Sequence, residues 1–372
     1  MIVSLIILLL LVLVLPFAVH KVEEELEIFL FVMGVAAALI SHKMNLLLIE
    51  EALIEPVKIT IAVFVAGALF YVFHEHVTGF VEKTLSRMAM PVVVFLVVVF
   101  LGLVSSVITA IVAAILLAEI LILLPLKRPQ RIVITVIACF SIGFGAALTP
   151  IGEPLATIAI SKLNQDFFFL FRLLAKYIIP LVILLGFLSA IYMKRSAKQL
   201  AHEETIMQLE DISSEETAAN DKPAALEMPL IEDEPLEQDT WKGITLRAAK
   251  VYLFVMALIF LGAGFEPLIE RYVLGLAPQL LYWINMISAV LDNATLCAAE
   301  MSPSMFDKPL TVEAILMGLL ISGGMLIPGN IPNIISASKL RITSTEWARL
   351  GVPLGLIIMA LVYVIIFVLG FK

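Results

Sequence analysis

The chain is built of long apolar blocks separated by short polar breaks. Many blocks approach the length of about 20 residues that an α-helix needs to cross a membrane. Apolar helices are predicted at residues 2–19, 27–42, 57–73, 173–193, 247–264 and 348–370, with a short piece at 266–276. Residues 75–88 place apolar side chains at helical spacing beside charged ones, which predicts a helix lying in the membrane interface. The pattern is that of an all-α polytopic membrane protein.

Two apolar segments contain the same proline-broken polar motif. Residues 145–154 read GAALTPIGEP and residues 323–333 read GGMLIPGNIPN. An offset of 178 residues brings their first glycines and both of their prolines into register. Proline breaks a helix, and at membrane depth the freed backbone is tolerated only where it is buried in protein or lines a cavity. Interrupted helices in two matching halves are typical of the binding site of a secondary transporter.

Each broken segment follows an apolar run with small polar residues at its middle. We therefore expect two inverted-topology repeats, each with a re-entrant hairpin and a discontinuous helix. The hairpins are predicted at about 90–125 and 279–305, and the broken helices at about 132–163 and 312–340. The resulting units are N-terminal membrane helices at 1–56, a first repeat at 57–195 and a second repeat at 241–372. If either hairpin were instead two full spans, the opposite orientation of the repeats would be less well supported.

The charge is distributed unevenly along the chain. The net charge is −8, yet residues 196–240 alone hold 13 acidic and two basic side chains, so the rest is slightly basic. This acidic segment has the composition of a disordered linker, which we place in the cytoplasm. With re-entrant hairpins, 16 Lys and Arg lie on the linker side of the membrane and eight on the other side. That bias follows the positive-inside rule and favours the inverted arrangement.

The composition excludes several classes of protein. Hydrophobic residues make up 61% of the chain and charged residues 15%, against about 25% charged in soluble domains. The two cysteines, Cys139 and Cys297, lie in apolar segments and are predicted to be buried thiols. No CxxC, HExxH, GxSxG or P-loop motif occurs, so we expect neither an enzyme nor a fixed metal or cofactor. ATP could be used only through a partner ATPase, and no nucleic-acid partner is expected.

A candidate cation site lies at the predicted tip of the second hairpin. Asp292, Asn293 and Thr295 occupy this tip. The tip is expected to face the second broken loop, which holds Asn330 and Asn333. Carboxylate, amide, hydroxyl and freed carbonyl oxygens are the ligands that a hard alkali cation prefers. Alternatively, Asp292 and Asn293 cap a helix. We expect Asp292, Asn293 and Asn330 to contact a transported cation.

The first half offers a carboxyl group in its broken loop. Glu153 is expected to face a hairpin tip that carries Ser105, Ser106 and Thr109. Because burial disfavours the charged form, a carboxyl group at this depth holds a proton readily and suits a proton carrier. Alternatively, Glu153 caps the half-helix that begins at Pro154.

Two further acids, Glu119 and Glu300, follow the hairpin tips on the returning arms. Each is either functional, interfacial or paired with another helix.

The tip sequence SAVLDNAT and the loops LTPIGEP and IPGNIPN resemble the ion transporter superfamily. That group includes NhaD-type sodium/proton antiporters, the arsenite-pump membrane subunit and divalent-anion/sodium symporters. The short chain is also similar to a prokaryotic family of predicted cation transporters. The resemblance implies inverted repeats, hairpin tips that meet broken loops, and homodimers in the cytoplasmic membrane of a prokaryote. It implies ion ligands in the second half at Ser288, Asp292, Asn293, Thr295, Asn330 and Asn333, and in the first half at Ser105, Ser106, Thr109, Thr149 and Glu153. The first tip departs from the pattern because it has no Asn or Asp, so Glu153 would supply that carboxylate.

The expected function is secondary transport of a cation, with sodium exchanged for protons across the lipid bilayer. Neither broken loop contains Arg or Lys, which favours a cation over an anion. The alternative is a sodium-coupled symporter of a small anion such as a dicarboxylate, held by half-helix N-termini. A channel, an intramembrane enzyme and a subunit of an ATP-driven pump are weaker alternatives.

Overall fold

The computed structural model describes residues 1–370 with gaps at 20, 23–24, 58–59, 62–63, 66–67, 69–87, 218–240, 273–274, 292, 302–304 and 306. All regular elements of the described residues are helical. The first half contains α1 (Ile2–Ala18), α3 (Leu26–Ile40), α5 (Met90–Ile108), α6 (Ala110–Leu123), α7 (Arg128–Ala146), α8 (Pro154–Leu163) and α9 (Phe169–Thr217). The second half contains α10 (Trp241–Tyr272), α11 (Pro278–Ile284), α12 (Asn293–Glu300), α13 (Pro309–Gly323), α14 (Ile331–Leu340) and α15 (Ser344–Tyr363).

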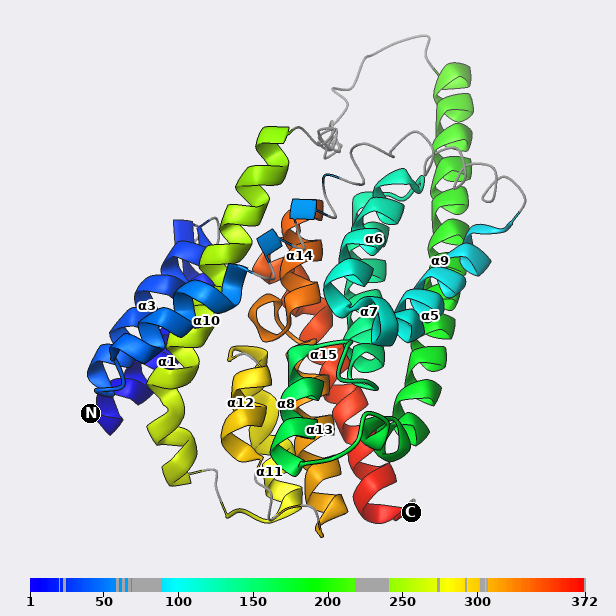
Figure 1. The fold of residues 1–372 in the computed structure, drawn as a ribbon. Helices are drawn as coiled ribbons and strands as arrows, with labels where there is room; N and C mark the ends of the chain where they lie inside the picture. Colours follow the sequence, from blue (N-terminus) through cyan, green and yellow to red (C-terminus); the bar gives the residue numbers. More distant parts are fainter. Residues whose placement is uncertain are drawn as a thin grey trace.

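The helices form two groups (Figure 1). In the smaller group α10 runs along α3 and beside α1. A further helical stretch at 46–57 joins this group, since Leu48 and Ala52 pack with Met256 and Phe260 of α10. The larger group contains α5 to α9 and α11 to α15. The groups meet where Ile335 of α14 packs with α6 and with α10.

Both predicted helix breaks are present. In the first half α7 ends at Ala146 and α8 begins at Pro154. In the second half α13 ends at Gly323, a 3₁₀ turn spans Ile327–Gly329, and α14 begins at Ile331. The interruptions lie where the duplicated prolines remove backbone donors.

The second half repeats the first residue by residue after each break. Glu153 and Asn330 precede α8 and α14 with nearly the same extended backbone, φ −155° and ψ 159° against φ −154° and ψ 145°. Both helices have 10 residues, and both end at a left-handed residue, Asn164 or Arg341. These equivalent positions are 177 residues apart. The sequence repeat is therefore also a repeat of backbone conformation.

Each predicted hairpin is divided at its polar middle. Residues 90–123 form α5 and α6 with a break at Thr109, whose φ is +77°. The second run forms α11, a 3₁₀ turn η1 (Asn285–Ala289) and α12. Asp292 and the predicted interfacial helix at 75–88, apart from its last residue, lie outside the described residues.

Two predicted boundaries differ from the structure. α10 is one helix that continues past Pro267, whereas a separate piece was expected at 266–276. Packing along α3, where Gly264 lies against Ala37, keeps the helix continuous across this proline. α9 extends to Thr217, well into the segment predicted to be disordered from 196. Residues 196–217 contain no Pro or Gly and many strong helix formers, which accounts for the extension.

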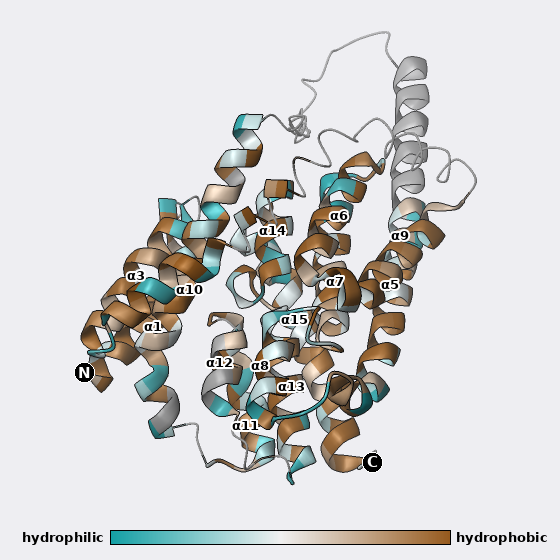
Figure 2. Cartoon of the chain, viewed as in Figure 1, coloured by the Kyte–Doolittle hydropathy of each residue, from teal (hydrophilic) through white to brown (hydrophobic). Residues whose placement is uncertain are grey.

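The outer helices are largely apolar (Figure 2), and several of their large apolar side chains are exposed. Phe100 on α5, Phe187 on α9 and Ile357 on α15 are 63%, 54% and 66% exposed. Five helical stretches of the described chain are long and apolar enough to cross a membrane: Met90–Ile108, Arg128–Ala146, Phe169–Lys198, Trp241–Leu268 and Ser344–Val368. An apolar surface over such helices suits contact with lipid rather than with water.

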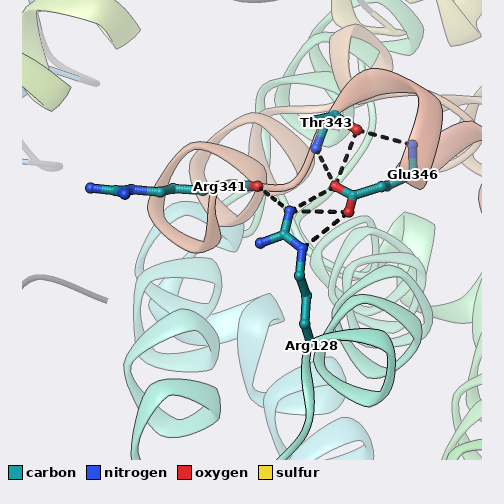
Figure 3. A network of polar contacts seen from close by, with 4 residues as sticks. All are labelled: Arg128, Arg341, Thr343 and Glu346. Atoms are coloured by element: carbon teal, nitrogen blue, oxygen red, sulfur yellow. Dashed lines mark hydrogen bonds and ion pairs between the residues drawn. The ribbon is translucent and has the colours of Figure 1, made fainter. Parts of the chain in front are cut away.

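A polar network joins the two halves at one end of the larger group (Figure 3). The Arg128 guanidinium, at the start of α7, donates to both carboxylate oxygens of Glu346 and to the carbonyl of Arg341. Glu346 also accepts hydrogen bonds from the backbone N–H (2.8 Å) and the hydroxyl of Thr343, which caps α15. This network fixes the turn after α14 relative to α7.

Candidate functional site

The first hairpin tip lies against the first broken loop. The Ala110 N–H donates to the Gly152 carbonyl at 2.8 Å. The Thr149 hydroxyl donates to the carbonyl of Ser106, and the Ser105 hydroxyl donates to the Ile142 carbonyl at 3.0 Å. Backbone and hydroxyl groups together therefore hold the tip to the loop.

Glycines allow the first tip and α7 to approach at backbone distance. A Cβ on Gly145 would collide with the carbonyl of Gly102, and a Cβ on Gly102 would collide with the Ser141 hydroxyl. Ser141 donates to the Val98 carbonyl at 2.9 Å. The first glycine of the duplicated motif is thus required by the close crossing of α5 and α7.

The second broken loop is organised around Gly323. The Asn333 amide donates to the carbonyls of Gly323 (2.8 Å) and Leu326 (2.9 Å). A Cβ on Gly323 would lie 3.5 Å from the Asn293 amide nitrogen. A Cβ on Gly329 would lie 2.8 Å from the Ser288 carbonyl. Asn293, Asn333 and Ser288 are thus buried together where the second tip meets the second loop.

The two halves interlock beyond their own loops. α8 packs against α12 of the second half, and α14 packs against α6 of the first half. The Cys297 thiol donates to the Leu155 carbonyl at 3.7 Å, which places α12 directly beside the start of α8. The structure thus brings the starts of both half-helices to the interface between the repeats.

All four break points reach one cavity of about 830 Å³. Its wall on the larger group includes Thr109, Gly152, Glu153, Ala294 and Asn330. Its opposite wall is formed by residues 48–55 and by α10 between Val255 and Glu266. The cavity therefore lies between the two groups of helices, where binding pockets commonly occur.

Glu153 and Asn330 occupy equivalent positions in this cavity. Both are buried, at 5% exposure, and each precedes its half-helix. Neither side chain caps its own helix. A Cβ on Gly143 would lie 2.8 Å from the Asn330 amide nitrogen, so this glycine leaves room for the amide. The alternative interpretation, in which the Glu153 side chain caps α8, is therefore not what the structure shows.

The charged residues of the cavity are mainly acidic. Four carboxylates line it, against a single lysine: Glu51, Glu55, Glu153 and Glu266, with Lys162. Glu266 is paired with Lys43 at 2.7 Å. This excess of negative charge attracts cations and repels anions.

Sequence reasoning missed Glu51, Glu55 and Glu266. They lie on the smaller group of helices, far along the chain from both loops. The available signal was the i, i+3, i+7 spacing of Leu48, Glu51 and Glu55, which places them on one helical face. Nothing in that spacing indicated which loop the face would meet.

Thr109 holds a backbone conformation that a non-glycine residue rarely adopts. Its φ of +77° and ψ of 151° lie in a region populated almost only by glycine. Its hydroxyl accepts a hydrogen bond from the Val112 N–H at 3.4 Å and so caps α6. A strained residue in the wall of a cavity is a candidate functional residue.

The other predicted first-half ligands bond mainly to the backbone. Ser105 also donates to the Gly102 carbonyl, and Ser106 donates to the Leu103 carbonyl at 2.7 Å. The Thr149 hydroxyl donates to the Ser106 carbonyl. In the second half, Asp292 and the side chain of Thr295 lie outside the described residues. Ion binding by these residues stays a prediction.

The fold and the cavity define the class of the protein. It is an all-helical chain with several helices able to cross a membrane, as in a multi-pass membrane protein, and a cavity lies at its duplicated helix breaks. A model of the family described as "Protein of unknown function (DUF1646)" matches residues 2–369, and the chain belongs to this family. No curated protein matches the chain.

Proposed function

We propose that the protein is a secondary active transporter that moves a small cation across the membrane in exchange for protons, by alternating access. Sodium is the cation to test first. The observation that carries the proposal is a cavity that both helix breaks reach and that is lined by four carboxylates and one lysine among the described residues. A buried carboxyl group such as Glu153 can hold a proton or help to bind a cation, which is what an exchanger requires.

The proposal includes a finer arrangement of the fold. The two halves would be inverted repeats with re-entrant hairpins, as in the ion transporter superfamily that the loop sequences resemble. The smaller group of helices would form a scaffold against which the larger group moves. A homodimer in the cytoplasmic membrane of a prokaryote is part of the same proposal. The equivalent backbone of residues 153–164 and 330–341 supports the repeat.

One observation favours a second candidate, a sodium-coupled symporter of a small anion. The N-termini of α8 and α14 both lie at the cavity, since Pro154 and Ile331 line it. The positive end of a helix dipole attracts anions. The acidic lining opposes an anion, so the cation exchanger is the stronger proposal.

Purified protein in proteoliposomes distinguishes the two candidates. With an imposed pH gradient, sodium, lithium, potassium and a dicarboxylate are added in turn, and lumenal pH is followed by a fluorescent dye. The exchanger predicts that at least one cation collapses the gradient and that the dicarboxylate does not. Sodium-dependent uptake of a radiolabelled dicarboxylate without proton movement would instead establish the symporter.

A further inference from the structure

Four glutamates are buried in the described part of the chain: Glu119, Glu153, Glu300 and Glu313. Two of them form ion pairs with buried or half-buried lysines. Glu119 on α6 pairs with Lys339 on α14, and Glu313 on α13 pairs with Lys176 on α9 at 2.9 Å. An ionised carboxylate inside a membrane protein requires such a counter-charge. Glu153 lies in the wall of the cavity, and Glu300 lies outside it.

The repeat explains why Glu300 has no lysine partner among the described residues. α14 packs on α6 and supplies Lys339 to Glu119, while α8 packs on α12, which carries Glu300. The residue of α8 equivalent to Lys339 is Lys162, 177 residues earlier. Lys162 is exposed and lines the cavity instead. In the part of the chain that the structure describes, the acid of the first hairpin is therefore paired with a lysine, and that of the second hairpin is not.

The charged side chains described on the elements that pack against α12 lie in the cavity, contact other residues or are exposed. α12 packs against α8, α10, α13 and the η1 turn. Glu153, just before α8, and Lys162 on α8 lie in the cavity. On α10, Lys250 pairs with Glu27, Glu266 pairs with Lys43, and Arg271 lies over the ring of Tyr272. On α13, Glu313 pairs with Lys176. Within the described residues, Glu300 forms no ion pair with any of them. Its charge must be neutralised in another way.

Glu300 meets the side-chain amide of Asn285. The Asn285 Nδ2 donates to Glu300 Oε2 at 2.9 Å, and the two side chains are 0% and 2% exposed. The remaining oxygens, Asn285 Oδ1 and Glu300 Oε1, are buried without a hydrogen-bond partner among the described residues. Both are acceptors if the carboxyl group is ionised, and leaving either unsatisfied is costly. A proton on Glu300 turns one acceptor into a donor and can satisfy both.

We propose that Glu300 and Asn285 form a proton-binding site in the second hairpin, where a neutral carboxyl group and an amide exchange two hydrogen bonds. A proton binds to the Glu300 carboxylate to form the carboxylic acid, and no other bond changes. Neither residue lines the cavity, so the proton is held apart from the cation. The role of this proton in the exchange rests on the proposed function.

Infrared spectroscopy of the full-length protein in liposomes tests the site directly. At pH 7 exposed glutamates, with a pKa of about 4.3, are ionised. Wild type is expected to show the C=O band of a protonated carboxyl group at this pH. Glu153, proposed above to hold a proton, would contribute to the same band, so the comparison is made in a Glu153→Gln background. There Glu300→Gln should lose the band and keep its thermal stability, because Gln retains one donor and one acceptor for Asn285. Asn285→Ala should keep the band but shift it, since the acid loses its amide partner.

Glu313→Gln serves as the control, because an ion-paired glutamate contributes no such band. Absence of the band in wild type, or an equal band in Glu153→Gln and in the Glu153→Gln/Glu300→Gln double variant, would overturn the proposal. In proteoliposomes Glu300→Gln is expected to retain sodium-for-sodium exchange and to move fewer protons per sodium. An unchanged ratio of protons to sodium ions would show that Glu300 takes no part in the exchange. If wild type moves no sodium, the proposed function fails while the infrared result still decides the proton site.

Discussion

At the residue scale, the site combines groups that the sequence singled out with contacts that it could not show. Glu153 and Asn330 are recognisable because each lies within a proline-broken motif, and both lie at the cavity. The hydrogen-bond partner of Glu300 could not be predicted from the sequence. This partner, Asn285, lies on the other arm of the same hairpin and is buried only by tertiary packing. Pairing of Glu119 with Lys339 joins positions 220 residues apart, which no local pattern predicts.

Replacement of Thr109 tests backbone strain at the first tip. Glycine adopts a φ of +77° without strain, so Thr109→Gly should stabilise the protein by about 1 kcal/mol despite the weaker cap. Thr109→Val is the matched control, since it keeps the strain and loses the hydroxyl that caps α6, and it should destabilise by about 1 kcal/mol. Thermal unfolding in detergent measures both. Equal stability of the glycine variant and wild type would show that Thr109 is not strained.

At the element scale, the helix breaks and most helix positions could be predicted, because proline and hydrophobic periodicity act locally. The interruptions between α7 and α8 and between α13 and α14 fall inside the expected segments. The continuity of α10 across Pro267 could not be predicted, since it depends on packing against α3. The cross-packing of α8 on α12 and of α14 on α6 is likewise a property of the assembled fold.

The Arg128 network should stabilise the junction of α7, α14 and α15. Arg128→Ala removes hydrogen bonds to the Glu346 carboxylate and to the Arg341 carbonyl. Because the ion pair is only partly exposed, we expect the free energy of unfolding to fall by about 1 kcal/mol. Arg172 provides the control. Its pair with Asp166 is 58% exposed on both sides, so Arg172→Ala should lower the stability less than Arg128→Ala does. Equal effects in thermal unfolding would contradict a special role for the Arg128 network.

The crossing of α5 and α7 offers a sharper test of packing. Gly145→Ala adds a Cβ that would collide with the Gly102 carbonyl, so the helices must move apart. Overpacking of this kind typically costs about 1–3 kcal/mol. The first tip and loop should loosen as well, which faster hydrogen exchange of the Ala110 amide would report. An unchanged exchange rate would show that the crossing accommodates the methyl group elsewhere.

At the scale of the whole molecule, an acidic cavity lies between two groups of helices. The sequence indicated a membrane protein with a duplicated broken helix, since composition and motif register are visible without a structure. The contribution of residues 48–55 and α10 to the cavity was not visible, because that wall comes from parts of the chain without a polar motif. Alternating access would require the two groups to move relative to each other around this cavity.

Proton movement driven by a sodium pulse in proteoliposomes tests the proposed cation–proton exchange itself. Wild type is expected to acidify or alkalinise the lumen according to the direction of the sodium gradient. Asp292→Asn and Glu153→Gln should each abolish that response, because each removes a carboxylate proposed to bind the exchanged ions. Glu313→Gln, which alters a glutamate paired with Lys176, should retain it. A wild-type protein that moves no protons with any alkali cation, or an Asp292→Asn variant with full exchange, would contradict the account.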